Sequence, residues 1–359
     1  MVLLAEVSLR GLALAHLPDI SVGAAAWHIA RRNKRKWMVG RYFMKKISLI
    51  VPCYNEETCL PAFDREISKV VEGMQGYEFE ILYVNDGSKD NTLKEIRQIS
   101  ERRGYVRYLS FSRNFGKEAA MYAGFCNATG DYVAVMDADL QDPPGLLPDM
   151  VKILEEGEYD SVATRRVNRA GEPPIRSFFA KMFYKLINKI SDADIVDGAR
   201  DYRLMKREMV DVIVAMGERN RFSKGIFGWI GFRTYWYAFE NVERAAGETK
   251  WSFWKLLKYS IDGIVSFSQA PLNIASWIGV LCTGISAIAI IFIIVRKLIF
   301  GDDVQGWASN MCVMIFIGGV QLFCLGVIGQ YLGKTYAETK KRPHYIVSEC
   351  SDSQIKKIG

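Results

Sequence analysis

Two long uncharged apolar runs near the C-terminal end constrain the fold of this chain most. Ile274–Val295 and Val304–Gly333 contain no Asp, Glu, Lys or Arg. About 20 apolar residues are enough for a helix to cross a bilayer, whereas the core helices of soluble proteins have shorter apolar stretches. We therefore predict two transmembrane helices within residues 271–333. The alternative is a pair of buried core helices.

The charges around these runs predict their orientation. Four basic residues follow the second run, Lys334, Lys340, Lys341 and Arg342, and basic residues favour the cytoplasmic side of a membrane. We expect residues 334–359 to form a cytoplasmic tail. Because two crossings return the chain to its starting side, the N-terminal part and both termini are also expected in the cytoplasm. The aromatic and basic residues of 251–270 predict a juxtamembrane amphipathic segment at the interface, with an ordinary amphipathic helix as the alternative.

Residues 1–43 differ from the rest of the chain. They carry seven Lys or Arg and two acids, so the remaining residues contribute only +2 to the net charge of +7. A body so nearly neutral gives no indication of nucleic-acid binding. The basic run follows the weakly apolar stretch, the reverse of a secretory signal. We interpret 1–43 as an extension without a fold of its own, the alternative being a targeting segment or basic membrane arm.

Residues 44–250 show alternating strand and helix patterns. Strands are predicted at Ile47–Pro52, Phe79–Asp86, Val106–Ser110, Tyr132–Asp137 and Ser161–Thr164, and helices at Leu60–Met74, Asp90–Arg103, Lys117–Ala128, Gly145–Glu156 and Arg176–Ile190. Less regular strands are expected at Tyr202–Lys206 and, on a sheet edge, Phe232–Phe239. Repeated units of this kind predict an α/β domain with a mostly parallel sheet and right-handed crossovers. Ligands bind such sheets at the carboxyl ends of the strands.

An acidic cluster follows one of the predicted buried strands. Asp137 and Asp139 are one residue apart, and Gln141 adds an amide two residues later. Oxygen ligands of this kind suit Mg²⁺ or Mn²⁺, and Mg²⁺ is often held by one or two carboxylates together with substrate phosphates. The cluster predicts a divalent metal site, although an acidic helix-capping turn has the same residues.

Two further polar clusters lie at neighbouring strand ends. Val51-Pro52-Cys53-Tyr54-Asn55-Glu56-Glu57 follows the first strand and Asn85-Asp86-Gly87-Ser88 the second. Asp86 is a candidate acceptor of hydrogen bonds from a nucleobase or ribose, and Gly87 permits close backbone approach. Either cluster alone is equally compatible with a helix-capping turn. The three histidines, His16, His28 and His344, lie near the termini, so a central site would work without a histidine base.

The pattern of these clusters resembles glycosyltransferase family 2, and in particular its polyprenyl-phosphate sugar transferases. The residues that carry the resemblance are Asp137-Ala138-Asp139-Leu140-Gln141-Asp142-Pro143, Ser112–Lys117, Asp201-Tyr202-Arg203-Leu204-Met205, Glu218-Arg219-Asn220-Arg221-Phe222 and Gly247–Lys250. It covers about Met44 to Lys341. It implies a Rossmann-like GT-A catalytic domain over 44–250 and inverting transfer of one sugar, glucose first, from a UDP-sugar to undecaprenyl or another polyprenyl phosphate.

The resemblance also implies roles for individual residues. Asp137, Asp139 and Asp201 are implied as catalytic, with Asp137, Asp139 and Gln141 as ligands of Mg²⁺ or Mn²⁺. Nucleotide-sugar binding is implied for Pro52, Tyr54, Asn55, Glu56, Asp86 and Lys117, and binding of the acceptor phosphate for Arg176, Arg203 and Arg221. Beyond the nucleotide sugar, the lipid and the membrane, a homo-oligomer and a downstream flippase are compatible partners.

Two other functions remain open on sequence grounds. A processive polysaccharide synthase shares this kind of domain, but no Q-x-x-R-W motif follows Asp201 and two spans are fewer than those enzymes have. A non-catalytic membrane-anchored module is the other alternative, although Asp137, Asp139 and Gln141 are all present. GlcNAc, galactose, mannose and aminoarabinose remain alternatives to glucose.

Overall fold

An eight-stranded mixed sheet organises the part of the chain that the computed structural model describes, residues 44–166, 182, 185, 188–190, 196, 198–239, 263–300 and 306–359. The strand order is β7-β5-β6-β4-β1-β2-β3-β8. The strands are β1 (Lys45–Cys53), β2 (Tyr77–Asn85), β3 (Val106–Phe111), β4 (Tyr132–Val135), β5 (Ser161–Arg166), β6 (Ala199–Lys206), β7 (Thr234–Phe239) and β8 (Val347–Cys350). The central four, β4, β1, β2 and β3, run parallel, which confirms the predicted α/β class.

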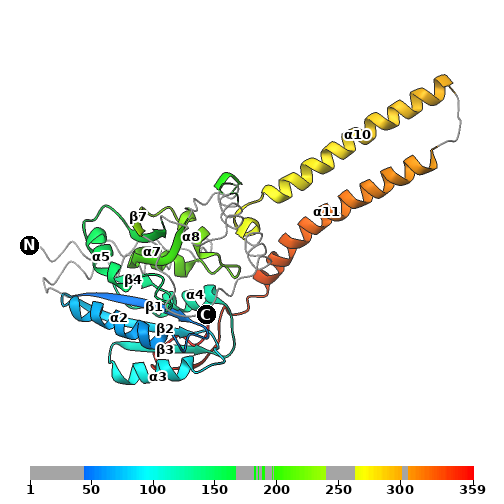
Figure 1. The fold of residues 1–359 in the computed structure, drawn as a ribbon. Helices are drawn as coiled ribbons and strands as arrows, with labels where there is room; N and C mark the ends of the chain where they lie inside the picture. Colours follow the sequence, from blue (N-terminus) through cyan, green and yellow to red (C-terminus); the bar gives the residue numbers. More distant parts are fainter. Residues whose placement is uncertain are drawn as a thin grey trace, which may run out of the picture. The chain divides into compact units, whose positions relative to one another are not determined.

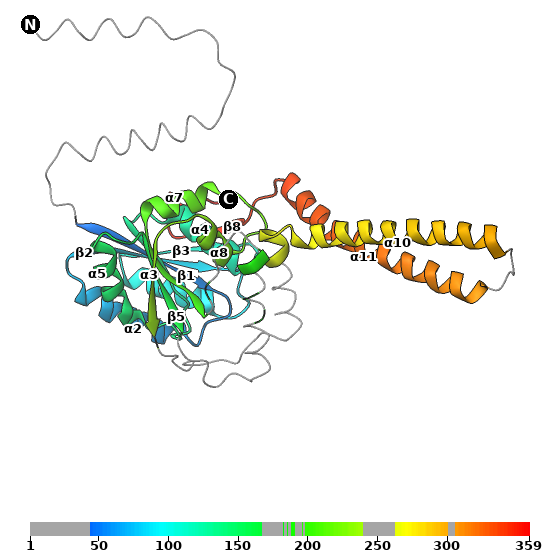
Figure 2. The ribbon, with the colours of Figure 1, turned by 90° about the horizontal axis from the view of Figure 1, so that it is seen from above.

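Helices cover both faces of this sheet (Figures 1 and 2). They are α2 (Leu60–Gly73), α3 (Thr92–Arg102) and α5 (Leu147–Glu155) on one face, and α4 (Lys117–Asn127), α7 (Arg207–Ala215) and α8 (Ser223–Trp229) on the other. The short 3-10 helix η2 (Pro144–Leu146) precedes α5. In β1, Leu49 packs into one apolar layer and Ile50 into the other, since successive strand side chains point to opposite faces. Because β1, β2 and β4 run parallel, their carboxyl ends lie at the same edge of the sheet.

The predicted elements match the observed ones to within a few residues at each end. The edge position of Phe232–Phe239 is confirmed by β7, which begins at Thr234. The predicted helix Arg176–Ile190, the segment 251–270 and the extension 1–43 lie mostly or entirely outside the described residues, although residues 263–267 are helical. α7, α8 and β8 were not predicted from the sequence.

Two long apolar helices follow the α/β domain in the chain. α10 (Ala270–Phe300) and α11 (Trp307–Thr339) include candidate membrane spans at Ala270–Arg296 and Val313–Thr339, with mean hydropathies of 2.8 and 2.0. Both run side by side (Figures 1 and 2), and neither window is buried within the protein. A soluble protein does not expose so much apolar side chain on two adjacent helices, so these helices have the length and surface of a transmembrane hairpin.

The residues after α11 return to the sheet. β8 pairs antiparallel with β3, placing Ser110 opposite Glu349, while Tyr345 and Ile355 are buried in the apolar layer around α4. The edge of β3, whose backbone groups would otherwise be free to pair with another chain, is thereby covered. Residues 334–339 of the predicted tail belong to α11. The residues after α11 are thus part of the folded domain rather than a simple appendage.

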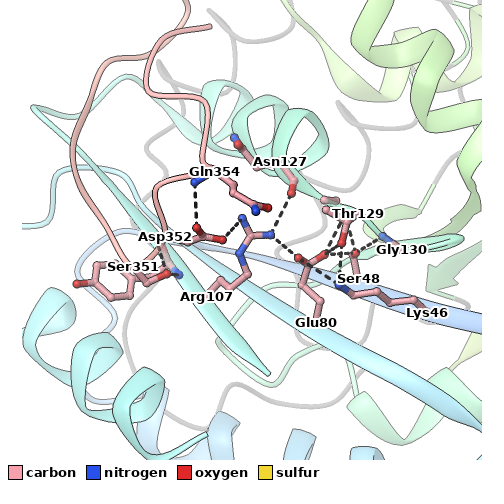
Figure 3. Close-up of polar contacts among 12 residues, drawn as sticks. Lys46, Ser48, Glu80, Arg107, Asn127, Thr129, Gly130, Ser351, Asp352 and Gln354 are labelled. Carbon is pink, nitrogen blue, oxygen red and sulfur yellow. Dashed lines mark hydrogen bonds and ion pairs between the residues drawn. The ribbon is translucent and has the colours of Figure 1, made fainter. Parts of the chain in front are cut away.

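A charge cluster around the buried Glu80 ties this tail to the amino-terminal part of the sheet (Figure 3). The carboxylate of Glu80, 2% exposed, accepts hydrogen bonds from the Ser48 hydroxyl at 2.5 Å and the Thr129 backbone N–H at 3.0 Å, and pairs with Arg107. Arg107 also pairs with Asp352 of the tail at 3.2 Å. Burial alone would raise the pKa of Glu80, but the donors and cations around it lower that pKa overall.

Replacing Arg107 by methionine should destabilise the protein by about 3 kcal/mol, the lower end of the cost of breaking a buried ion pair, because Glu80 keeps only the more distant Lys46, at 3.7 Å, as a cation partner. Arg97→Met is the matched control. It removes an exposed pair with Glu349, whose side chains are 46% and 34% exposed, and should cost less than about 1 kcal/mol. Thermal unfolding of the full chain in detergent should show a melting temperature lower by about 6–12 °C for the Arg107 variant. Equal shifts in both variants would contradict a structural role for the Glu80–Arg107 pair.

Candidate active site

The loops that follow β1 and β2 are held together by hydrogen bonds between backbone and side chain. The Asn55 N–H donates to Ser88 Oγ at 3.0 Å, and the Lys89 N–H donates to Asn55 Oδ1 at 2.9 Å. The Glu56 N–H donates to Thr92 Oγ1 at 2.8 Å. Asn55 has a positive φ of 54°, which asparagine tolerates better than most residues. Of the predicted nucleotide-binding residues, Pro52 lies in β1. Tyr54, Asn55 and Glu56 lie on the loop that these bonds hold, where the Tyr54 ring is partly exposed.

Asp86 lies at the end of β2, and both of its carboxylate oxygens accept backbone hydrogen bonds. The donors are the N–H of Phe115 at 2.6 Å and that of Gly116 at 2.9 Å. Burial raises the pKa of Asp86 to about 6, although these donors and Arg113 oppose the shift. Gly87 has a φ of +62°, and a Cβ there would lie 2.4 Å from the backbone of Arg113. Asp86 and Gly87 thus set the loop that leads into α4, and the contact of Asp86 with a nucleotide stays a prediction.

Lys117, the first residue of α4, joins two of the three predicted catalytic carboxylates. Its Nζ lies 2.7 Å from Asp137 Oδ1 and 2.5 Å from Asp201 Oδ2. Asp137 follows β4, and Asp201 belongs to β6, which is antiparallel to β4 with Val135 opposite Arg203. Continuing that register by two residues brings Asp137 beside Asp201. The structure therefore assembles Lys117, Asp137 and Asp201 at the carboxyl edge of the parallel strands.

The charges of this cluster fix its protonation. Burial alone would lower the pKa of Lys117, but Asp137 and Asp201 raise it well above its usual range. Burial alone would raise the pKa of Asp201, but Lys117, with Lys224 and Arg200, lowers it well below the usual range. Lys117 is consequently a cation and Asp201 an anion throughout the neutral pH range.

The loop that carries Asp139 is shaped by its own hydrogen bonds. Asp139 Oδ1 accepts the N–H of Gln141 at 3.1 Å, and Leu140 between them has a φ of 59°. The amide oxygen of Gln141 faces two guanidinium groups, those of Arg166 and Arg200, each at 3.4 Å. The buried Asp142 accepts a bond from Arg200 at 2.8 Å, and burial raises its pKa to about 6 although Arg200 opposes the shift.

These residues fit a divalent ion by the chemistry of their donor atoms. Asp137 and Asp139 are partly exposed carboxylates on one loop, and the described residues contain no group of three or more His, Cys, Asp or Glu that would form a metal cage. A site of two carboxylates completed by substrate phosphates is the arrangement that Mg²⁺ commonly has. Gln141 faces two guanidinium groups and Asp137 pairs with Lys117, so the roles of Asp137, Asp139 and Gln141 as metal ligands stay predictions.

A pocket of about 220 Å³ lies beside this cluster. Its lining residues include Arg200, Arg203, Lys224, Phe227, Thr234 and Trp236. Arg203 is 4% exposed. Its Nη1 donates to Ser161 Oγ at 3.2 Å and Thr234 Oγ1 at 3.3 Å, while its guanidinium lies 4.5 Å from the Phe227 ring centre.

The guanidinium group of Arg203 is only partly balanced by its surroundings. Its Nε is buried without a hydrogen-bond partner in the described part of the chain, and Asp201, two residues earlier in β6, is the acidic residue whose charge acts on it. Burial lowers its pKa to about 9, and Asp201 opposes the shift, so the group remains charged at neutral pH. Since burying a partly balanced charge is costly, a pocket lined by this cation and Lys224 is suited to an anion.

The other two arginines predicted to hold the acceptor phosphate are placed differently. Arg221 donates to the carbonyl oxygens of Met216 and, at 3.3 Å, Ile213 at the end of α7, and it lies over the Tyr122 ring at 4.3 Å. It satisfies carbonyl groups that a helix end leaves without partners, and its role at a phosphate stays a prediction. Arg176 lies outside the described residues.

Sequence reasoning missed Arg200 and Lys224. Arg200 precedes Asp201 in β6 and therefore lies on the opposite face of the strand, where it pairs with Asp142. The sequence signal that could have indicated a cationic site was the presence of arginine at both 200 and 203. Lys224 lies in α8, and its Nζ donates a hydrogen bond to the Ala199 carbonyl oxygen at 3.0 Å. Nothing in the sequence connects α8 to β6.

Comparison with known proteins identifies relatives across most of this chain. Residues 48–214 match the family described as "Glycosyl transferase family 2", and residues 270–335 match the "GtrB C-terminal hairpin". The chain is 45% identical over 305 residues to the "Putative glycosyltransferase CsbB" of Bacillus subtilis (strain 168), covering 85% of this chain and 92% of that protein. It is 42% identical to the "Prophage bactoprenol glucosyl transferase homolog" of Escherichia coli (strain K12) and 41% identical to the "Bactoprenol glucosyl transferase" of Shigella phage SfX, each over 84% of this chain and 98% of the relative.

Proposed function

Because the chain belongs to glycosyltransferase family 2, we propose that it transfers a single glucose, with inversion, from UDP-glucose to undecaprenyl or another polyprenyl phosphate. The observation that carries the proposal is the buried Arg203, whose Nε has no hydrogen-bond partner, in a cationic pocket two residues along β6 from Asp201. The relatives named as bactoprenol glucosyl transferases support the same acceptor and sugar. Their similarity extends over the hairpin as well as the catalytic domain.

The proposed reaction forms one bond and breaks one. A phosphate oxygen of the acceptor attacks the anomeric carbon, while the bond from that carbon to the diphosphate breaks and UDP leaves with the electron pair. A phosphate monoester is largely dianionic at pH 7 because its second pKa is about 6, so no strong base is required. Asp201, whose pKa is held low by Lys117, is a poor proton acceptor, and we assign it a role in positioning the substrates.

The side chains around Asp201 have complementary tasks in this proposal. Arg203 and Lys224 hold the acceptor phosphate, and the Asn55 loop together with Tyr54 holds the nucleotide. Lys117 keeps Asp137 and Asp201 in place and contributes positive charge where the diphosphate departs. A divalent ion bound by Asp137 and Asp139 would supply further charge stabilisation of that leaving group.

We propose that the catalytic domain and the tail lie on the same side of the membrane. The chain leaves the domain, passes through α10 and α11, and returns to add β8 to the same sheet as β1. An even number of crossings is the simplest path that permits this pairing. Together with Lys334, Lys340, Lys341 and Arg342, this path supports a cytoplasmic location for the domain and the tail. The proposed boundaries are therefore a catalytic domain at 44–250, two spans within 271–333, and a tail that belongs to the domain.

A direct transfer assay tests this function. Membranes that contain the full chain are incubated with undecaprenyl phosphate and one radiolabelled donor at a time: UDP-glucose, UDP-GlcNAc, UDP-galactose or GDP-mannose. We expect label in the lipid extract with UDP-glucose, as a single monosaccharide-lipid species. Label from another donor would correct the sugar, polymeric product would indicate a processive synthase, and the absence of lipid label with every donor would contradict the proposal.

Replacing Arg203 by alanine should raise the apparent KM for the lipid phosphate about ten- to a hundredfold and change that for UDP-glucose much less. The lost charge-assisted contact is worth about 1.5–3 kcal/mol, and about 1.4 kcal/mol corresponds to a factor of ten. Lysine should restore part of the affinity, since it supplies charge without the planar guanidinium group.

Each substrate is titrated at saturation of the other in detergent micelles. Arg233→Ala, which changes an arginine that is 69% exposed, is the control and should leave both constants unchanged. If the constant for UDP-glucose rises more than that for the lipid, Arg203 belongs to the donor side. If neither constant changes, Arg203 does not bind the acceptor phosphate, and its role is structural, through the two hydroxyl groups and two aromatic rings around it.

A further inference from the structure

The segment Arg219–Ser223 connects the catalytic domain to the membrane hairpin. The backbone N–H groups of Arg219 and Asn220 donate to one carboxylate oxygen of Glu338, at 2.8 and 3.1 Å. Glu338 lies in the last turn of α11, at the end of the second candidate span. The guanidinium of Arg219 donates to the carbonyl oxygens of Arg342 and Pro343, at 2.6 and 2.8 Å. One short segment thus holds the end of α11 and the start of the tail.

The same segment also holds the residues that precede α10. Asn220 Nδ2 donates to Ser266 Oγ at 2.5 Å, and Lys334 Nζ of α11 donates to that oxygen at 3.1 Å. The Tyr331 hydroxyl of α11 donates to the Ser268 carbonyl at 2.6 Å. We call this set of contacts around Glu338, Asn220 and Ser266 the junction. It fixes the ends of both membrane helices to one point of the domain.

Close packing beside the junction leaves little room for movement. The rings of Phe222 and Phe267 are 5.9 Å apart between centres. A Cβ at Gly225, the third residue of α8, would lie 2.5 Å from a ring carbon of Phe267. The residues before α10 therefore touch the helix that supplies Lys224 to the anion pocket.

The other end of the segment reaches the active-site helix. The Ser223 N–H donates to both carboxylate oxygens of Glu118, at 3.1 and 3.0 Å, and the Ser223 hydroxyl donates to the same carboxylate. Glu118 directly follows Lys117 in α4. A continuous series of contacts accordingly runs from Glu338, through Arg219–Ser223, to Glu118, the neighbour in the chain of the lysine that bridges Asp137 and Asp201.

A membrane-resident acceptor is held at two places. Its phosphate must reach the pocket of Arg203 while its hydrocarbon chain stays in the bilayer, so the geometry between pocket and hairpin decides whether both are satisfied. We propose, on the basis of the proposed function, that Glu338 is a positioning residue for the lipid acceptor: it fixes the membrane hairpin to Arg219–Asn220 and so sets the reach of a bilayer-anchored phosphate into the active site. A short prenyl phosphate dissolved in water has no such requirement.

The test compares two acceptors with the full chain reconstituted in phospholipid vesicles. Undecaprenyl phosphate resides in the bilayer, and geranyl phosphate reaches the pocket from water. Glu338→Ala should lower kcat/KM for undecaprenyl phosphate about tenfold, the typical effect of losing hydrogen bonds to a charged group, and leave that for geranyl phosphate and the KM for UDP-glucose within about twofold. Glu338→Gln keeps an acceptor oxygen and should recover part of the loss.

The control is Glu66→Ala, which removes an exposed carboxylate of α2 paired with Lys69 and should change neither acceptor. Equal losses with both acceptors would show that Glu338 supports the fold alone and would overturn the inference. A changed KM for UDP-glucose would overturn it as well, because it would place the effect on the donor. If the unaltered protein transfers sugar to neither acceptor, the proposed function itself fails, an outcome that the wild-type measurements separate from the others.

Discussion

Replacing Asp139 by asparagine should abolish detectable sugar transfer, a loss of at least about a thousandfold, while leaving the fold intact. Asparagine keeps the side-chain oxygen that accepts the Gln141 N–H, so the loop retains its shape. The substitution removes one negative charge from the two carboxylates proposed to hold the divalent ion, and thereby stabilisation of the leaving diphosphate, whose loss typically costs two to three orders of magnitude or more. Transfer is measured at saturating Mg²⁺ and Mn²⁺.

Two further measurements make this prediction specific. Mn²⁺ binding in the presence of UDP, followed by electron paramagnetic resonance, should weaken together with activity. Asp149→Asn, which alters an exposed carboxylate that accepts a bond from the Tyr237 hydroxyl, is the control and should retain activity and Mn²⁺ binding. Near-normal turnover of the Asp139 variant would exclude Asp139 as a metal ligand.

Replacing Lys117 by methionine should lower kcat by at least about a hundredfold. The substitution removes the cation shared by Asp137 and Asp201, so two carboxylates that met the same nitrogen now repel each other. It also removes positive charge beside the departing diphosphate. Arginine should restore part of the rate because it restores the charge.

The activity of the Lys117→Met variant should fall as the pH falls. In the unaltered protein the pKa of Asp201 is lowered, and the carboxylate stays charged as the pH falls to 5. Without Lys117, burial, which by itself raises the pKa of Asp201, acts unopposed by its nearest cation. The residual activity of Lys117→Met should therefore decline from pH 8 to pH 5, while that of Lys152→Met, an exposed lysine of α5, should follow the unaltered protein. Parallel profiles for all three would contradict the assigned role.

The central sheet was predictable because its strands follow simple local rules. β1, β2 and β4 are apolar runs that end in polar turn residues, such as Asn55, Asp86 and Asp137, and the topology of a parallel sheet brings those ends together. The prediction that Asp137 and Asp201 share one site needed the antiparallel pairing of β4 with β6. The pairing was not predicted. The family resemblance implied the catalytic role of Asp201, and the pattern of residues gave only a less regular strand at Tyr202–Lys206.

The contacts that sequence reasoning missed depend on long-range pairing. β8 is four residues long and contains Ser348 and Glu349, so neither length nor apolar alternation marks it as a strand. Its partner β3 lies more than two hundred positions earlier in the chain. For Lys117, contact with a diphosphate and a structural role were equally compatible with the sequence. The position of its Nζ between two carboxylates became evident from the tertiary structure.

The pairing of β8 with β3 has a consequence for how the protein is made. During synthesis, β3 emerges from the ribosome long before β8, and both candidate membrane spans lie between them. The edge of β3 therefore stays unpaired while the hairpin is being inserted. The ion pair between Arg107 and Asp352 cannot form until the tail has been synthesised. The nascent domain passes through a stage with an unpaired strand edge, the kind of surface that chaperones shield and that leads to aggregation. Correct insertion of the hairpin thus becomes a condition for finishing the catalytic sheet, because a tail left on the wrong side of the membrane cannot reach β3.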